Sequence, residues 1–146
     1  LYIIPFVTPR SLTLTYFRIS ITSATPGTIN IGIYNNIKLT NGNDNPGNLI
    51  ASVTGLNTSV AQNVTANINF TFQPNTLYWI GLMASSAPTL RAVPVASVAS
   101  SLGRFVSSNN GVTHLYLDYA AFGLPSIAPT DLVSGSGNIP AIYLGE

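Results

Sequence analysis

The sequence predicts an all-β protein, an antiparallel β-sandwich with little helix, on the basis of three observations. Ser, Thr and Asn each contribute 15 of the 146 residues, and these residue types favour strands or turns over helices. Apolar and polar residues alternate with period two along several segments, which turns one face of each segment toward a core. Clusters of Pro, Gly and Asn separate these segments at spacings of roughly 12–18 residues, which is typical of a sandwich.

The individual strands follow from this alternation. It is clearest over residues 64–72, where five apolar side chains from Val64 to Phe72 share one face. Residues 12–22 form a longer β run whose apolar phase slips after Tyr16, which indicates a bulge or a change of packing partner. Segment 77–84 is apolar on both faces and contains Trp79, so we expect a covered central strand. Further strands are expected at residues 28–34, 49–53, 111–120 and 139–144. Seven segments are thus identified, and the overall spacing predicts about eight strands.

The segments between these strands carry turn residues. Turns are predicted at residues 25–27, 41–47, 73–75 and 109–111, because Pro, Gly and Asn adopt the backbone angles that turns require. Residues 92–102 are the one stretch that could form a short helix. No internal repeat or domain boundary is visible, so residues 1–146 are expected to form one domain. Because the first residue is Leu, we expect the sequence to be a segment of a longer or processed chain.

Composition argues against several classes of protein. Charged residues make up 6% of the chain, against about 25% in average globular proteins. The absence of Cys removes disulfide scaffolds and thiol nucleophiles. No apolar run reaches the roughly 20 residues that cross a bilayer, so membrane insertion is not expected. The few cationic residues are scattered, so we expect no nucleic-acid partner; they are Arg10, Arg18, Lys38, Arg91 and Arg104.

The inventory of catalytic side chains is short. A Ser–His–Asp triad would need His114, the only histidine, as its base. Asp118 is about 13 Å away along an extended strand at ~3.3 Å per residue. His114 shares a strand face with Tyr116 and Asp118, and we expect it to be an exposed strand residue. No pair of carboxylates suits a glycosidase, and residues 41–48 offer calcium a single carboxylate. We therefore expect no enzymatic activity, no cofactor and no metal site.

Several short motifs occur in a particular order along most of the chain. They are YIIPFVTPR at residues 2–10, the β run at 12–21, PG at 26–27 leading into IGIY at 31–34, NPGNL at 45–49, FQPNTLYW at 72–79, APTLR at 87–91 and NIPAIYL at 138–144. Their order and spacing resemble the jelly-roll domains of bacteriophage tail fibres and other virion appendages. The resemblance implies a jelly-roll sandwich and a non-enzymatic, extracellular virion protein, a distal or tip domain of a tail fibre for host attachment.

The resemblance also implies partners. It implies a homotrimer that contacts other virion proteins and a glycan or protein of the host cell surface. We expect these contacts to come from loops at one end of the sandwich, because strand faces are needed for packing. Amides can hydrogen-bond sugar hydroxyls and a tyrosine face can pack on a pyranose ring. The candidate contact residues are therefore Asn43, Asp44, Asn45, Asn109, Asn110, His114 and Tyr116.

Alternative interpretations stay open. In the first, both polar loops are simple turns whose amides bond their own backbone, with no ligand. A capsid decoration protein or head fibre would share the same fold. A carbohydrate-binding module of a secreted glycanase would require a fused catalytic domain. For a virion appendage, the neutral, hydroxyl-rich surface suits adhesion that should vary little with salt. A hydrolase would need glycan turnover that depends on His114 or Asp118.

Overall fold

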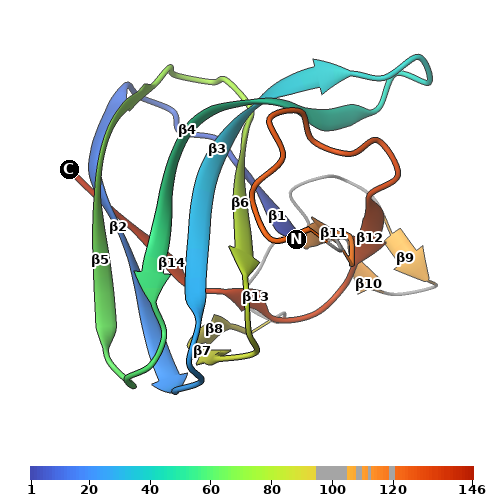
Figure 1. Cartoon of the computed structure of the whole chain (residues 1–146). Coiled ribbons are helices and arrows are strands. Elements are labelled where there is room, and N and C mark those ends of the chain that lie inside the picture. Colours follow the sequence, from blue (N-terminus) through green and yellow to red (C-terminus); the bar gives the residue numbers. More distant parts are fainter. Residues whose placement is uncertain (95–104, 108–109, 112, 119–120) are drawn as a thin grey trace.

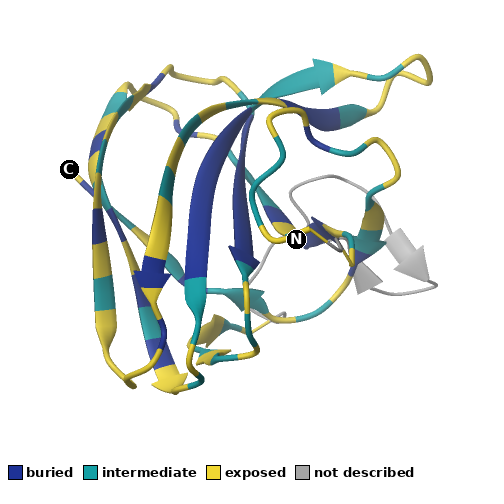
Figure 2. Cartoon of the chain, viewed as in Figure 1, coloured by how far each residue is buried: buried dark blue, intermediate teal, exposed yellow. Residues whose placement is uncertain are grey.

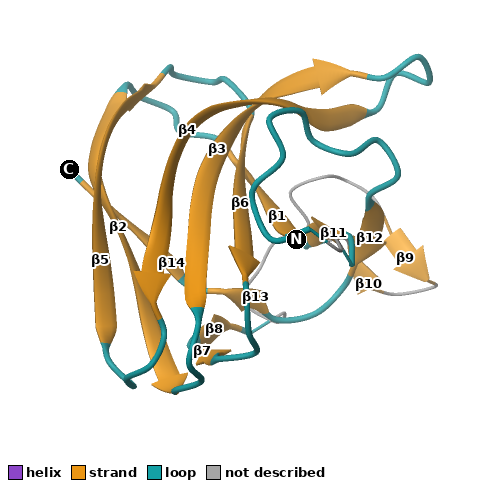
Figure 3. Cartoon of the chain, in the orientation of Figure 1, coloured by secondary structure: helices purple, strands orange, loops and turns teal. Residues whose placement is uncertain are grey.

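A computed structural model describes residues 1–94, 105–107, 110–111, 113–118 and 121–146. These residues contain fourteen strands and no helix, and every strand pair is antiparallel, which confirms the predicted all-β class (Figure 1, Figure 3). In chain order the strands are β1 (Tyr2–Phe6), β2 (Leu12–Ser23), β3 (Thr28–Lys38), β4 (Asp44–Asn57), β5 (Asn63–Phe72), β6 (Tyr78–Ala84), β7 (Thr89–Leu90), β8 (Ala92–Val93), β9 (Phe105–Ser107), β10 (Asn110–Gly111), β11 (His114–Tyr116), β12 (Val133–Gly135), β13 (Ile139–Pro140) and β14 (Ile142–Gly145).

Two sheets form the sandwich. The six-stranded sheet has the order β12-β11-β1-β6-β3-β4, and the four-stranded sheet has the order β14-β2-β5 with β7 paired to β2. Two ribbons of two strands each, β10-β9 and β13-β8, complete the described part of the chain. The arrangement is an antiparallel β-sandwich, as expected, and its assignment as a jelly roll stays a prediction.

The phase slip in β2 corresponds to a bulge. Leu14 pairs with Phe70 and Phe17 pairs with Ala66, so β5 has three residues between the paired positions where β2 has two. The extra residue restores the register, and it lets Leu14 and Phe17 both enter the core although they lie three positions apart. Tyr16 is thereby turned toward the opposite face of the sheet.

The main core lies between the two sheets. Ile29, Ile31 and Ile33 of β3 enter it from the six-stranded sheet, and Phe17 and Phe72 enter it from the other sheet. All five side chains are fully buried, as the period-two pattern predicts for one face of each strand. Figure 2 shows the resulting gradient, with dark central strands and exposed outer edges.

A second, smaller core covers the opposite face of the six-stranded sheet. Tyr34 and Trp79 are paired neighbours on β3 and β6, and both are fully buried there with Ile3. The segment 121–132 lies over them, and the Tyr34 hydroxyl donates a hydrogen bond to the carbonyl oxygen of Pro125 at 3.0 Å. β6 is therefore covered on both faces, as its apolar sequence predicted.

Several predicted boundaries were wrong. β4 begins at Asp44, so the turn expected over residues 41–47 is shorter, and the sequence NPG belongs to a strand that pairs with β3. β11 ends at Tyr116, well before the expected end of the 111–120 strand. The expected final strand is divided at Ala141 between β13 and β14. Residues 92–93 are strand β8 and not the start of a helix; residues 95–102 of that expected helix lie outside the described residues.

The two sheets differ in extent. Tyr2 pairs with Leu82, a residue of the main core, and also with Tyr116 of β11, so the inner face of the six-stranded sheet continues past β1. Figure 1 shows β2, β5 and β14 beside β3 and β4, away from β11 and β12. The four-stranded sheet therefore covers one half of the six-stranded sheet and leaves the half formed by β11 and β12 without this cover.

Candidate functional site

Three aromatic rings gather on the inner face of the uncovered half. Tyr2 and Tyr116 are direct partners across β1 and β11, and His114 lies two residues before Tyr116 on the same face. The ring centroids are 6.5 Å apart for Tyr2–Tyr116, 5.5 Å for Tyr2–His114 and 5.9 Å for His114–Tyr116. We call these three residues the aromatic surface.

The two tyrosines of the aromatic surface are open to solvent, and no Asp, Glu, Lys or Arg is among the described residues that line the hollow beside them. Tyr2 is 45% exposed and Tyr116 is 37% exposed. With His114 they line a shallow hollow of about 350 Å³, whose remaining wall is the 134–136 segment, Ser-Gly-Ser. The hollow thus combines aromatic faces with hydroxyl and backbone groups, the chemistry that recognises a neutral polyhydroxylated ligand.

His114 is held in place by its neighbours and is buried, which corrects the expectation of an exposed histidine. Its Nδ1 is 2.9 Å from the Thr113 hydroxyl, which also donates to the carbonyl oxygen of Gly137 at 3.1 Å. The imidazole packs over Gly135, where a Cβ atom would collide with the ring. Burial lowers the pKa of His114 from its ordinary value, so the neutral imidazole is favoured at neutral pH.

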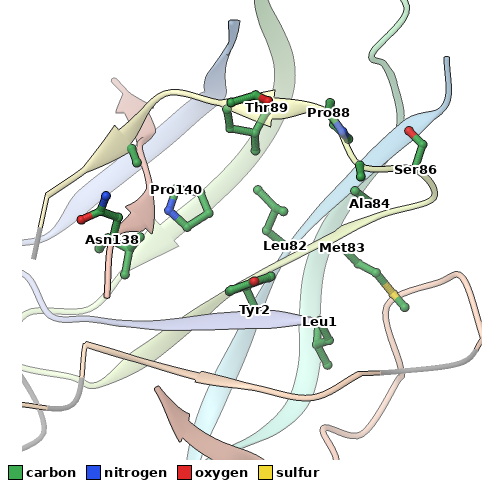
Figure 4. A pocket seen from close by; sticks show the side chains of 14 residues that line it. Leu1, Tyr2, Leu82, Met83, Ala84, Ser86, Pro88, Thr89, Asn138 and Pro140 are labelled. Atoms are coloured by element: carbon green, nitrogen blue, oxygen red, sulfur yellow. The ribbon is translucent and has the colours of Figure 1, made fainter. Parts of the chain in front are cut away.

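A larger, mostly apolar hollow adjoins this surface. It has a volume of about 500 Å³ and lies between the ends of β1 and β6 on one side and β7, β8 and β13 on the other (Figure 4). Tyr2 lines both hollows, with Leu1 and Leu82 beside it in the larger one. The two hollows therefore meet at Tyr2.

The predicted contact residues of the first polar loop lie elsewhere. Asn43 is exposed at the tip of the β3–β4 hairpin, which extends away from β11 in Figure 1. Asp44 accepts a hydrogen bond from the Asn36 amide at 2.6 Å and pairs with the Lys38 ammonium at 2.9 Å. Asn45 is buried, and its amide donates to the carbonyl oxygen of Pro46. Of these three predicted contact residues, all within the described part of the chain, Asn43 is the one whose side chain could meet a ligand without giving up such contacts.

The other predicted contact residues divide into two groups. Asn109 lies outside the described residues, and Asn110 is the first residue of β10. His114 and Tyr116 come together as expected, but on a strand face and not in a loop. The sequence reasoning missed Tyr2, Thr113 and Gly135. Residues 1–6 show no alternation of apolar and polar side chains, so the local sequence offered no signal for Tyr2.

The described residues show no catalytic arrangement around His114. No carboxylate there hydrogen-bonds or ion-pairs with its ring, and burial is the cause of its pKa shift. Asp118 lies beyond the end of β11 and is exposed. In the same part of the chain, no three His, Asp or Glu side chains are grouped as a metal site would require. A membrane-crossing helix is likewise not found among the residues described.

Comparisons with protein-family models, with characterised proteins and with solved structures find no match for this chain.

Proposed function

We propose that this chain is a non-catalytic attachment domain of a virion appendage, a distal or tip domain of a phage tail fibre that contacts the host cell surface. The observation that carries the proposal is the aromatic surface, two exposed tyrosines and a buried histidine on a sheet half that the second sheet leaves uncovered. The antiparallel sandwich and the low charge are consistent with it. The motif order described above supplies the link to virion appendages.

The ligand that fits this surface best is a neutral sugar unit of a surface glycan. The C–H face of a pyranose can pack on the face of Tyr2 or Tyr116, while its hydroxyls reach the backbone and side chains of residues 134–136. A shallow, open hollow of this kind gives weak binding at each single site, in the millimolar range of about −4 kcal/mol. Several linked copies would raise the overall avidity by about a hundredfold or more.

This need for several sites supports a homotrimer as part of the proposal. The structure leaves large apolar side chains exposed outside the aromatic surface, among them Ile50, Val60 and Ile127 at 43%, 55% and 66% exposure. Contact between copies would remove such side chains from water. Sedimentation of the full-length protein tests this part: we expect a trimer, and a stable monomer at micromolar concentration would contradict it.

A carbohydrate-binding module of a secreted glycanase is the second candidate, and the same tyrosine pair favours it. The two functions differ in the other domains expected in the full-length protein. The full-length open reading frame distinguishes them, because a glycanase module must be fused to a catalytic domain.

A cryo-EM map of the intact virion tests the proposed function. We expect density for this chain at the distal end of the tail fibres, with β11 and β12 facing outward. Density on the capsid capsomers would replace the proposal with a decoration or head-fibre protein. Absence of the chain from purified virions would reject both.

A further inference from the structure

The outer face of the four-stranded sheet carries a second hollow, of about 490 Å³. Tyr16, Arg18 and Ser20 of β2 line it because they alternate with the buried residues Phe17 and Ile19. From β14, Tyr143 joins as the direct cross-strand partner of Arg18. Arg91 completes this group, which we call the arginine hollow, and its backbone N–H is anchored to the carbonyl oxygen of Ser20 at 2.8 Å.

Within the described residues, the arginine hollow contains the two cationic side chains that lack an acidic partner. Of the four cationic side chains in the described residues, Arg10 pairs with Glu146 at 3.2 Å and Lys38 pairs with Asp44 at 2.9 Å. The other two are Arg18 and Arg91; within the described part of the chain neither has an ion pair, and both line this hollow. No acidic side chain is among the residues that line it.

The immediate neighbours of Arg18 are neutral. Its Nε donates a long hydrogen bond of 3.4 Å to the Thr65 hydroxyl, and its guanidinium lies 5.3 Å from the centre of the Tyr16 ring. A cation–π contact of this kind orients the guanidinium without neutralising its charge. Tyr143 beside it is 47% exposed. The hollow therefore places positive charge next to an accessible aromatic face in a chain that otherwise has few charges.

We propose that the arginine hollow binds an acidic saccharide, with a carboxylate or phosphate group held by Arg18 and Arg91 and the sugar ring packed on Tyr143. The planar guanidinium matches both anions because it donates two parallel hydrogen bonds. This site is separate from the aromatic surface, since it lies on the outer face of the other sheet. It also reverses the expectation of salt-insensitive adhesion, because exposed ion pairs weaken as salt rises.

Binding of the whole protein to three immobilised polymers tests the proposal: a polyuronate, a polyglycerol phosphate and neutral dextran. We expect wild-type protein to bind at least one acidic polymer, and R18Q/R91Q to lower that affinity by at least about tenfold. The polymer that is bound identifies the anion as a carboxylate or a phosphate. Failure to bind either acidic polymer would overturn the proposal.

The matched control is R10Q/K38Q, which also removes two positive charges, but from exposed positions outside the hollow. We expect it to retain acidic-polymer binding. Equal losses in the two double variants would show a net-charge effect and reject a built site. Y2A/Y116A should also retain this binding, so a failure of the arginine hollow can be told apart from a failure of the proposed function.

Discussion

The six-stranded sheet has a covered half around β3 and β6 and an uncovered half around β11 and β12. Both halves are built from antiparallel strands, but their aromatic side chains serve different purposes. Around β3 and β6 both faces are packed, and Trp79 and Tyr34 are fully buried on the face opposite the main core. Around β11 and β12 the inner face loses its cover, so Tyr2 and Tyr116 remain exposed. Tyrosines of one sheet can thus serve stability or contact, depending on what packs over them: segment 121–132 covers Tyr34, whereas the four-stranded sheet does not reach Tyr2 and Tyr116.

The covered half should respond most strongly to mutation. Trp79→Ala removes a fully buried indole and its hydrogen bond, in which Nε1 donates to the Asn36 side-chain oxygen at 2.9 Å. We expect the free energy of unfolding to fall by about 3–5 kcal/mol. Chemical denaturation followed by tyrosine fluorescence or circular dichroism measures it. A loss below about 1 kcal/mol would mean that this half is not tightly packed.

A matched pair of glycines sharpens the comparison. In Gly81→Ala of the covered half, the new methyl would lie 2.8 Å from the ring of Tyr34. That ring is held in place because its hydroxyl donates a hydrogen bond to the Pro125 carbonyl oxygen. We expect a loss of about 1–3 kcal/mol from this overpacking. Gly135→Ala of the uncovered half also forces a ring, that of His114, to move. This ring borders the open hollow of about 350 Å³ and has room to shift, so we expect a cost of about 1 kcal/mol or less. Denaturation midpoints in the reverse order would contradict the comparison.

The smallest expected effect on stability is the pH dependence of the uncovered half. Burial lowers the pKa of His114 in the folded state, so the unfolded chain takes up the proton first as the pH falls below about 6.5. Stability should therefore decrease between pH 7 and pH 5 in the wild type. His114→Gln should remove this decrease, because His114 is the only histidine. An unchanged pH profile in that variant would show that His114 is not the responsible group.

Features of the fold that depend on local residue patterns were predictable from the sequence, and features that depend on long-range strand pairing were not. The buried faces of β3 and β5 are local period-two patterns, and Trp79 lies in a run that is apolar on both faces, so all three were predictable. The bulge was visible as the phase slip after Tyr16. The end of β11 and the division at Ala141 depend on which strands find partners, and local residue types do not encode that choice.

The candidate site was only partly predictable for the same reason. Tyr2 and Tyr116 lie near opposite ends of the described chain, and only the pairing of β1 with β11 brings them together. Asp44 was expected in a free loop because its neighbours are turn residues. In the structure it is tied to Asn36, which in turn accepts from Trp79, so a loop-like local sequence serves the packed half of the sheet.

Binding of labelled protein to host cells tests most directly whether the uncovered half is a contact surface. The decisive variant is Y2A/Y116A, and the control is Phe122→Ala, which removes a similarly exposed aromatic ring, 47% accessible, outside the aromatic surface. We predict that Y2A/Y116A keeps its free energy of unfolding within about 1 kcal/mol of wild type and loses at least about tenfold in cell binding. Phe122→Ala should bind as wild type does. Undiminished binding of folded Y2A/Y116A would contradict the assignment of the aromatic surface.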